Sequence, residues 1–148
     1  MSVLEPVVLP YVFAPEEGDP PAPIVEVEIR SPAGMRQYAC LLNSGSDHSA
    51  LPASLIDDLE IPLEELVATE VATGGGGWRR SLALRRPELL AIEIDGHETP
   101  IRPCFLMERD ELTGDEWEED VPVLGRDFFL GFTEVVFCQA AQEVHLRR

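Results

Sequence analysis

The pattern of hydrophobic and polar residues along the chain is that of a β protein. Residues 24–30 (IVEVEIR) alternate apolar and polar side chains, which predicts a strand with one face in the core and one face in solvent. Residues 31–34 form a turn, and residues 35–42 are the returning strand. Further strands are predicted for residues 66–73, 79–84, 89–94, 99–107, 132–138 and 143–146. The strands at 89–94 and 99–107 form a hairpin that turns at Asp95-Gly96.

Short segments between the strands carry helix and loop signals. Pro52, Ala53 and Ser54 open a short helix with apolar residues on one face, and this helix closes before Pro62. Residues 108–120 are strongly acidic and have little to bury, so we interpret them as a solvated loop or insertion.

The first 23 residues differ in composition from the rest. Residues 7–13 contain a short apolar piece, and residues 14–23 are acidic and rich in proline, which blocks both helices and central strands. We therefore divide the chain into a Pro-rich N-terminal arm, residues 1–23, and one folded domain, residues 24–148.

Charge and size narrow the range of partners. The 148 residues suffice for one domain with a real core, and the formal net charge is −17. Such acidity argues against nucleic acids and anionic membranes as partners, because both require clustered Lys or Arg. No apolar run is long enough to span a bilayer, and the N-terminus does not have the pattern of a signal peptide.

The titratable and nucleophilic side chains do not suggest a cofactor. His48, His97 and His145 lack metal-ligand spacing, so we expect no metal and no cofactor. The three cysteines are widely spaced; Cys40 and Cys138 lie in strand-like runs, where a small buried thiol is ordinary. The odd number of cysteines and the lack of a pairing pattern fit a reducing cytoplasm.

One stretch contains most of the candidate chemistry. Residues 41–52 (LLNSGSDHSALP) run from an apolar strand into small polar residues with a glycine, and then into an apolar segment with proline. This stretch resembles the active-site loop of the retropepsin-like aspartic peptidases, in which two apolar residues precede Asp, Thr or Ser, Gly, Ala or Ser, and Asp. The single departure is Asn43, which stands where the family has its catalytic Asp.

A second stretch strengthens the resemblance. Residues 121–129 (VPVLGRDFF) are similar to the second signature of that family, an apolar strand followed by Gly-Arg-Asp or Gly-Arg-Asn and a short apolar helix. The resemblance implies an all-β fold, a retropepsin-like closed β-barrel with one or two short helices. Because the chain has a single active-site loop, it also implies a symmetric homodimer that completes the site. In many dimers of that family the chain termini build an inter-subunit sheet. The apolar piece at residues 7–13 therefore either joins such a sheet or is disordered.

The resemblance also assigns roles to individual residues. Asn43, Ser44 and Gly45 occupy the catalytic positions, with Ser44 bracing the loop across the dimer and Gly45 allowing the substrate backbone to come close. Asp47 matches a residue that pairs with Arg126. Substrate-binding positions are Ser46, Asp47, Gly74, Gly75, Gly76, Gly77 and Trp78, and structural support comes from Arg126 and Asp127.

The four glycines lie between two predicted strands. They indicate a hairpin tip, which in the resembling family is a flap that closes over substrate; a plain surface turn is the alternative. A phosphate-binding loop is disfavoured, since no helix start, Lys or Ser/Thr follows the glycines.

The implied activity is peptide-bond hydrolysis by a water activated between two Asp from two subunits. An amide accepts no proton at ordinary pH, so Asn43 makes the chain inactive as given. The otherwise complete pattern favours an engineered Asp→Asn change in an aspartic endopeptidase. The alternatives are a natural pseudo-peptidase that serves as a peptide-binding or dimerisation module, and an unrelated small β-barrel that matches by chance.

Overall fold

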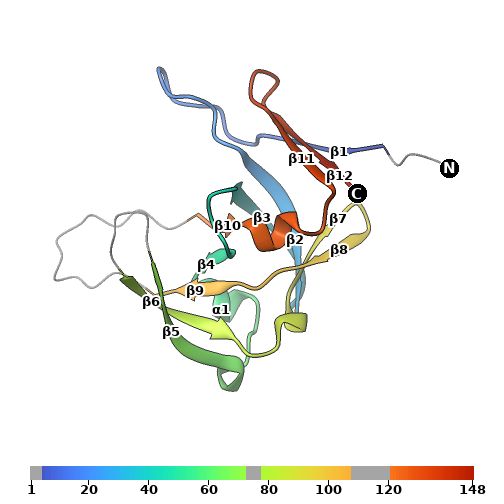
Figure 1. Cartoon of the computed structure of the whole chain (residues 1–148). Helices are drawn as coiled ribbons and strands as arrows, with labels where there is room; N and C mark the ends of the chain where they lie inside the picture. The colour runs from blue at the N-terminus through green and yellow to red at the C-terminus, as the bar shows by residue number, and fades with distance from the viewer. Residues whose placement is uncertain (1–4, 73–77, 108–120) are drawn as a thin grey trace.

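The structure, a computed structural model, describes residues 5–72, 78–107 and 121–148 and consists mainly of β-strands (Figure 1). The strands are β1 (Val7–Pro10), β2 (Ile24–Ser31), β3 (Gly34–Leu42), β4 (Ala50–Pro52), β5 (Leu66–Ala72), β6 (Trp78–Leu84), β7 (Ala91–Ile94), β8 (His97–Pro100), β9 (Cys104–Leu106), β10 (Val123–Leu124), β11 (Glu134–Cys138) and β12 (Glu143–Arg147). The helices are α1 (Leu55–Asp58) and α2 (Arg126–Phe129), with 3-10 turns η1 (Leu63–Glu65) and η2 (Pro87–Leu89).

The main sheet has nine strands in the order β5-β6-β9-β4-β10-β3-β2-β7-β8. It curls into a half-barrel, and the two edge strands of this order, β5 and β8, are not hydrogen-bonded to each other within the described residues. The short strand β10 runs parallel to β3 and antiparallel to β4. It therefore lies between the strand that precedes residues 43–49 and the strand that follows them, and this arrangement positions the candidate site.

A second sheet of three strands, β1-β12-β11, packs at the end of the molecule opposite the β5–β6 hairpin (Figure 1). β1 pairs antiparallel with β12 of the same chain, from Val7 opposite Leu146 to Pro10 opposite Glu143. Gln139 donates a hydrogen bond through its Nε2 to the carbonyl of Pro21 over 2.6 Å. The apolar piece of the N-terminal arm is therefore part of an intramolecular sheet, whereas residues 14–23 contain no helix or strand.

The hydrophobic core follows from strand alternation. In β2 the side chains of Val25, Val27 and Ile29 are buried and those of Glu26 and Glu28 are exposed, which confirms the predicted half-buried strand. The largest fully buried side chains come from both sheets, from α2 and from connecting segments: Phe105, Phe128, Ile29, Leu51, Leu59, Leu90, Ile92, Ile101, Leu124 and Leu146. One continuous core thus supports the loop that follows β3.

Most predicted elements are present. The short helix after Pro52 is α1, the helix after residues 121–125 is α2, and the hairpin at Asp95-Gly96 joins β7 to β8. The single strand predicted over residues 99–107 is wrong. It is divided into β8 and β9, because Pro100 and Pro103 have no N–H to donate to a neighbouring strand. The two halves join different neighbours: β8 pairs with β7, and β9 pairs with β4 and β6.

No helix among the described residues is both long enough and apolar enough to cross a lipid bilayer.

Candidate active site

Asn43 lies directly after β3, at the tip of the strand that the core supports. Its backbone N–H donates to the carbonyl of Leu124 in β10 over 3.0 Å. Its side-chain Oδ1 accepts a hydrogen bond from the N–H of Gly45 at 2.9 Å, and its carbonyl accepts one from Ser46 at 3.2 Å. The half-buried side chain is thus held in a tight turn by its own loop.

The loop that follows Asn43 is crossed closely by Gly125. A Cβ atom on Gly125 would lie 2.7 Å from the carbonyl oxygens of both Ser46 and His48, which is closer than real contacts allow. The next residue, Arg126, donates its N–H to the carbonyl of Ser46 over 2.8 Å. The two stretches singled out in the sequence therefore meet, and glycine is required because of this close approach rather than for an unusual dihedral angle.

Arg126 and Asp47 form an ion pair between the two stretches. The side chains are 59% and 70% exposed, so solvent screens the charges and the pair adds little to stability. Its geometric effect is to link the end of the loop to the start of α2.

A partly buried hydrogen-bond network connects the same elements. The hydroxyl of Ser49 donates to Oδ1 of Asp127 at 2.8 Å and accepts the N–H of Gly125 at 3.2 Å. The backbone N–H of Arg102 donates to Oδ2 of the same carboxylate at 2.8 Å. Asp127, which the sequence assigned to structural support, therefore connects α2, the loop and the segment before β9. Ser49 was part of the motif, but no local pattern predicted its pairing with Asp127 or the bond from Arg102, since the shared partner lies far away along the chain.

Of the other predicted site residues, those in the loop are described by the structure and the four glycines between β5 and β6 are not. Ser44 and Gly45 are exposed at the loop tip and Ser46 is half-buried. Gly74, Gly75, Gly76 and Gly77 lie outside the described residues. The hairpin that leads to them is present, because β5 pairs with β6 from Leu66 opposite Leu84 to Ala72 opposite Trp78.

The cysteines and carboxylates near the site do not form a metal centre. No group of three or more His, Cys, Asp or Glu residues in the described part of the chain is arranged to hold a metal ion. All three cysteines are free, and burial raises the pKa of Cys40 to about 12. Burial, with a smaller effect from Asp127, also raises the pKa of Cys104, so both thiols stay protonated near neutral pH.

Comparison with solved structures identifies the fold as retropepsin-like. A retropepsin-like aspartic protease from Rickettsia conorii superposes with a TM-score of 0.58 at 12% identity, over 97% of this chain and 99% of that protein. The EIAV protease, solved with the inhibitor HBY-793, aligns with a TM-score of 0.48 at 20% identity, over 84% of this chain and 100% of that protein. No protein-family description and no curated protein matches the sequence. The expected all-β, retropepsin-like fold is confirmed, in the form of a half-barrel.

Proposed function

We propose that the chain is the scaffold of a retropepsin-like aspartic endopeptidase that acts as a symmetric homodimer on polypeptides. In this proposal the active parent has Asp at position 43 and the present chain is an inactive Asp→Asn form. The observation that carries the proposal is the setting of Asn43: a strand end fixed by Leu124, with the N–H of Gly45 aimed at its Oδ1.

This setting suits a carboxylate as well as an amide. Asn and Asp have nearly the same shape, and the N–H of Gly45 would donate to either side chain. A hydrogen bond to the charged form of a carboxyl favours ionisation, which a general base requires. The close passage of Gly125 and the ion pair of Arg126 with Asp47 hold the loop in one geometry. Catalytic loops need such preorganisation.

One chain supplies one such position, and the chemistry needs two. When two carboxylates lie about 3 Å apart they cannot both ionise, so they share a proton, as in the aspartic-protease dyad that is the standard example of this effect. The ionised partner accepts a proton from the attacking water, and the protonated partner donates to the scissile carbonyl. A two-fold homodimer brings two copies of position 43 together, so a second copy of this chain is the proposed partner.

The substrate class follows from the hairpin and the loop. A polypeptide in extended conformation would lie between the β5–β6 hairpin, acting as a flap, and the Asn43 loop, with main-chain hydrogen bonds for affinity and side-chain pockets for specificity. Ser44, Gly45 and Ser46 are the proposed contacts at the centre, and Asp47, Gly74–Gly77 and Trp78 are the proposed contacts on either side.

Asn43 itself favours a second candidate function. A natural pseudo-peptidase would keep the same groove and dimer but use them only to bind peptides. The peptidase and the pseudo-peptidase differ in the side-chain group at position 43. A carboxylate there accepts a proton from water, and an amide does not.

The test is peptide cleavage by the Asn43→Asp variant beside the chain as given, from mildly acidic to neutral pH. Unfolded protein and a mixed peptide library serve as substrates, and mass spectrometry identifies the products. We expect cleavage by the Asp form alone, with inhibition by a statine-type transition-state analogue. Sedimentation analysis of both proteins verifies that each is a folded dimer.

A folded, dimeric Asn43→Asp protein that cleaves nothing would overturn the peptidase proposal. Peptide binding by both forms would then favour the pseudo-peptidase. A third variant, Asn43→Ala, controls for contaminating proteases, because it lacks both the amide and the carboxyl.

A further inference from the structure

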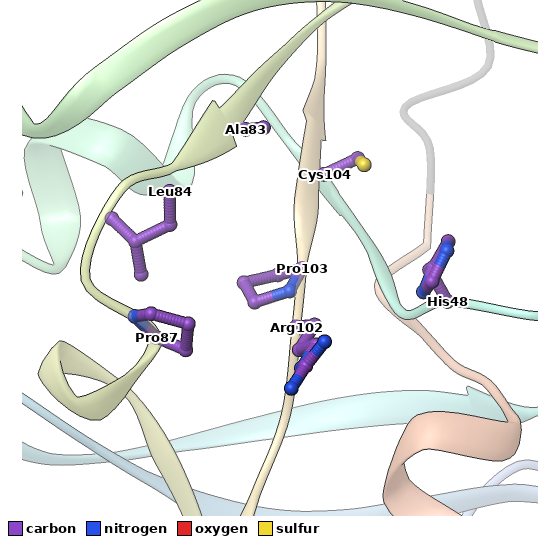
Figure 2. A pocket seen from close by; sticks show the side chains of 7 residues that line it. All are labelled: His48, Ala83, Leu84, Pro87, Arg102, Pro103 and Cys104. Carbon is purple, nitrogen blue, oxygen red and sulfur yellow. The ribbon is translucent and has the colours of Figure 1, made fainter.

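A pocket of about 280 Å³ opens beside the candidate active site, between β6, β9 and the loop that carries Asn43 (Figure 2). Its lining residues come from four segments of the chain: His48, Ala83, Leu84, Pro87, Arg102, Pro103 and Cys104. None of the residues that the sequence singled out for substrate binding lines it. The volume is close to the lower end of small-ligand pockets and fits one or two amino-acid side chains.

One side of the pocket is apolar. Leu84 and Pro87 face Pro103 across the hollow (Figure 2), and Ala83 lies next to them on β6. A hydrophobic side chain is therefore the natural occupant of this side. The thiol of Cys104 points to the other side of β9, toward His48 (Figure 2), and it is neutral because burial raises its pKa.

The other side carries cationic and hydrogen-bonding groups. Arg102 and His48 also line the pocket: Figure 2 shows Arg102 just below Pro103, and His48 on the far side of the β9 segment from Leu84. Arginine stays charged at all ordinary pH values and matches a carboxylate geometrically, and imidazole can donate a hydrogen bond even when neutral. In the described part of the chain, no carboxylate forms an ion pair with either side chain. Both side chains are exposed, and the permanent charge of Arg102 is locally complementary to a carboxylate on a ligand.

The carboxylate of Asp127 is engaged by hydrogen bonds to the backbone of the segment that carries Arg102 and to the loop. Its two oxygens accept from the hydroxyl of Ser49 and from the backbone N–H of Arg102, each at 2.8 Å. This second bond fixes the backbone of Arg102 and leaves the guanidinium to the pocket. The carboxylate of Asp127 is therefore a structural partner of the segment and does not line the cavity.

The pocket is within reach of a peptide bound at Asn43. His48 follows Asn43 by five residues, and five extended residues span at most about 18 Å. An extended polypeptide centred on Asn43 would cover this distance with about five residues on one side. The pocket is thus placed to bind a flanking part of the same polypeptide.

We propose that this pocket binds an apolar residue and an adjacent Asp or Glu of the polypeptide, in a segment that flanks the bond presented to Asn43. The apolar side chain packs on Leu84, Pro87 and Pro103, and the carboxylate pairs with Arg102 and His48. The inference rests on the proposed function for the identity of the ligand and adds a preference for acidic flanking sequences. Arg102 and His48 are then specificity-determining residues outside the catalytic loop tip.

The test uses two probes, acetyl-Leu-Glu-Leu-amide and acetyl-Leu-Gln-Leu-amide, titrated into the chain as given. NMR chemical shifts locate the binding, and their concentration dependence gives Kd. We expect the Glu probe to bind about fivefold more tightly than the Gln probe, with shifts at Ala83 and Arg102. Arg102→Gln should abolish this difference and His48→Gln should reduce it.

Arg36→Gln is the matched control, since it removes the same charge from an exposed position on β3 that does not line the pocket. An unchanged NMR spectrum outside the pocket verifies that each variant is folded. Equal affinity for the two probes, shifts elsewhere on the molecule, or an effect of Arg36→Gln as large as that of Arg102→Gln would each overturn the inference.

A cleavage assay separates this inference from the proposed function. If Asn43→Asp cleaves peptides without preference for flanking Glu over Gln, and Arg102→Gln leaves that ratio unchanged, the pocket inference fails and the peptidase stands. If the Glu preference in binding is present but no variant cleaves, the peptidase proposal fails and a peptide-binding module with this pocket remains.

Discussion

The hydroxyl of Ser49 donates to the carboxylate of Asp127 over 2.8 Å, and this contact joins the loop after β3 to helix α2. Ser49 is fully buried, so its hydroxyl has no access to water. The same oxygen accepts the N–H of Gly125, so a single side chain satisfies polar groups from two segments. At the buried end of this network, an unsatisfied polar group would be costly, so each partner matters there.

Replacing Ser49 by Ala removes a partner from both Asp127 and Gly125. We expect Ser49→Ala to lower the free energy of unfolding by about 1–3 kcal/mol, because the buried N–H of Gly125 is left unsatisfied and the half-buried carboxylate of Asp127 loses one of its two donors. Urea denaturation measures the change. Ser54→Ala is the control, since Ser54 is exposed and its side chain caps no helix N–H, and it should change stability by less than about 0.5 kcal/mol. Equal effects at the two positions would contradict this account of the network.

The close passage of Gly125 predicts a severe effect of adding a single methyl group. Gly125→Ala would bring Cβ to 2.7 Å from two backbone carbonyl oxygens, which cannot move without displacing the loop. We expect a loss of about 3 kcal/mol in the free energy of unfolding. Gly45→Ala meets only the side-chain Oδ1 of Asn43, at 3.2 Å, and should cost clearly less. If thermal and urea unfolding rank the two variants the other way, the crossing of the loop by residue 125 is not as tight as described.

These two effects also show what the sequence could predict. The Gly-Arg pair was singled out from its pattern, and so was the loop that it contacts. The burial of Ser49 against Asp127 was not predicted, because this partner lies 78 residues away and no local pattern reveals such a pair. Local alternation predicted β2 well, since each residue's face depends only on its neighbours in the strand.

Other features depended on pairings that the sequence does not encode locally. The break between β8 and β9 was not predicted, because most of residues 99–107 are apolar and suggest one strand, whereas Pro100 and Pro103 interrupt the pairing. β1 pairs with β12, which lies at the other end of the chain. The sequence alone therefore did not determine whether residues 7–13 form a strand or which strand they pair with. The pocket at Arg102 arises from four separate segments, and none of them has a recognisable motif.

Helix α2 provides a test of core packing with its own internal control. Phe128 is fully buried, and its ring meets Phe129 and Phe132 edge to face, with centroids 5.8 and 5.3 Å away. We expect Phe128→Ala to cost about 3–5 kcal/mol, because it leaves a cavity in the core. Leu130 lies two residues on and is 87% exposed, so Leu130→Ala should be nearly neutral. Comparable losses in urea denaturation would place residue 128 outside the core.

Cys40 predicts a specific dependence of stability on pH. Burial raises the pKa of its thiol from 9.0 to about 12, so the folded state keeps the proton when the unfolded state loses it. The stabilisation is complete below pH 9 and is lost as the pH rises toward 12, since the unfolded state then binds fewer protons than the folded state. Between pH 8 and 10.5 we expect Cys40 to account for a fall of about 2 kcal/mol in the free energy of unfolding.

The Cys40→Ala variant isolates this contribution. It is less stable at pH 8 because of the small cavity, but its unfolding free energy should fall less steeply with pH than that of the parent chain. Both tyrosines are present in both proteins, so their titration cancels in the difference except for the small effect of Cys40 on the pKa of Tyr38. Parallel pH profiles for the two proteins would show that the thiol is not held protonated by burial.

The proposed homodimer predicts an unusual response to salt. Each chain has a net charge of −17, so two copies repel each other over distances that salt shortens, from about 30 Å at 0.01 M to about 8 Å at 0.15 M. We expect the dimer dissociation constant to fall several-fold when NaCl rises from low to physiological concentration. Sedimentation velocity at a series of protein concentrations measures it. Sucrose at the same osmolality is the control, because it does not screen charge. A dimer that weakens with salt would require an interface held by charge pairs, and a monomer at every concentration and salt level would remove the two-fold site on which the proposed chemistry depends.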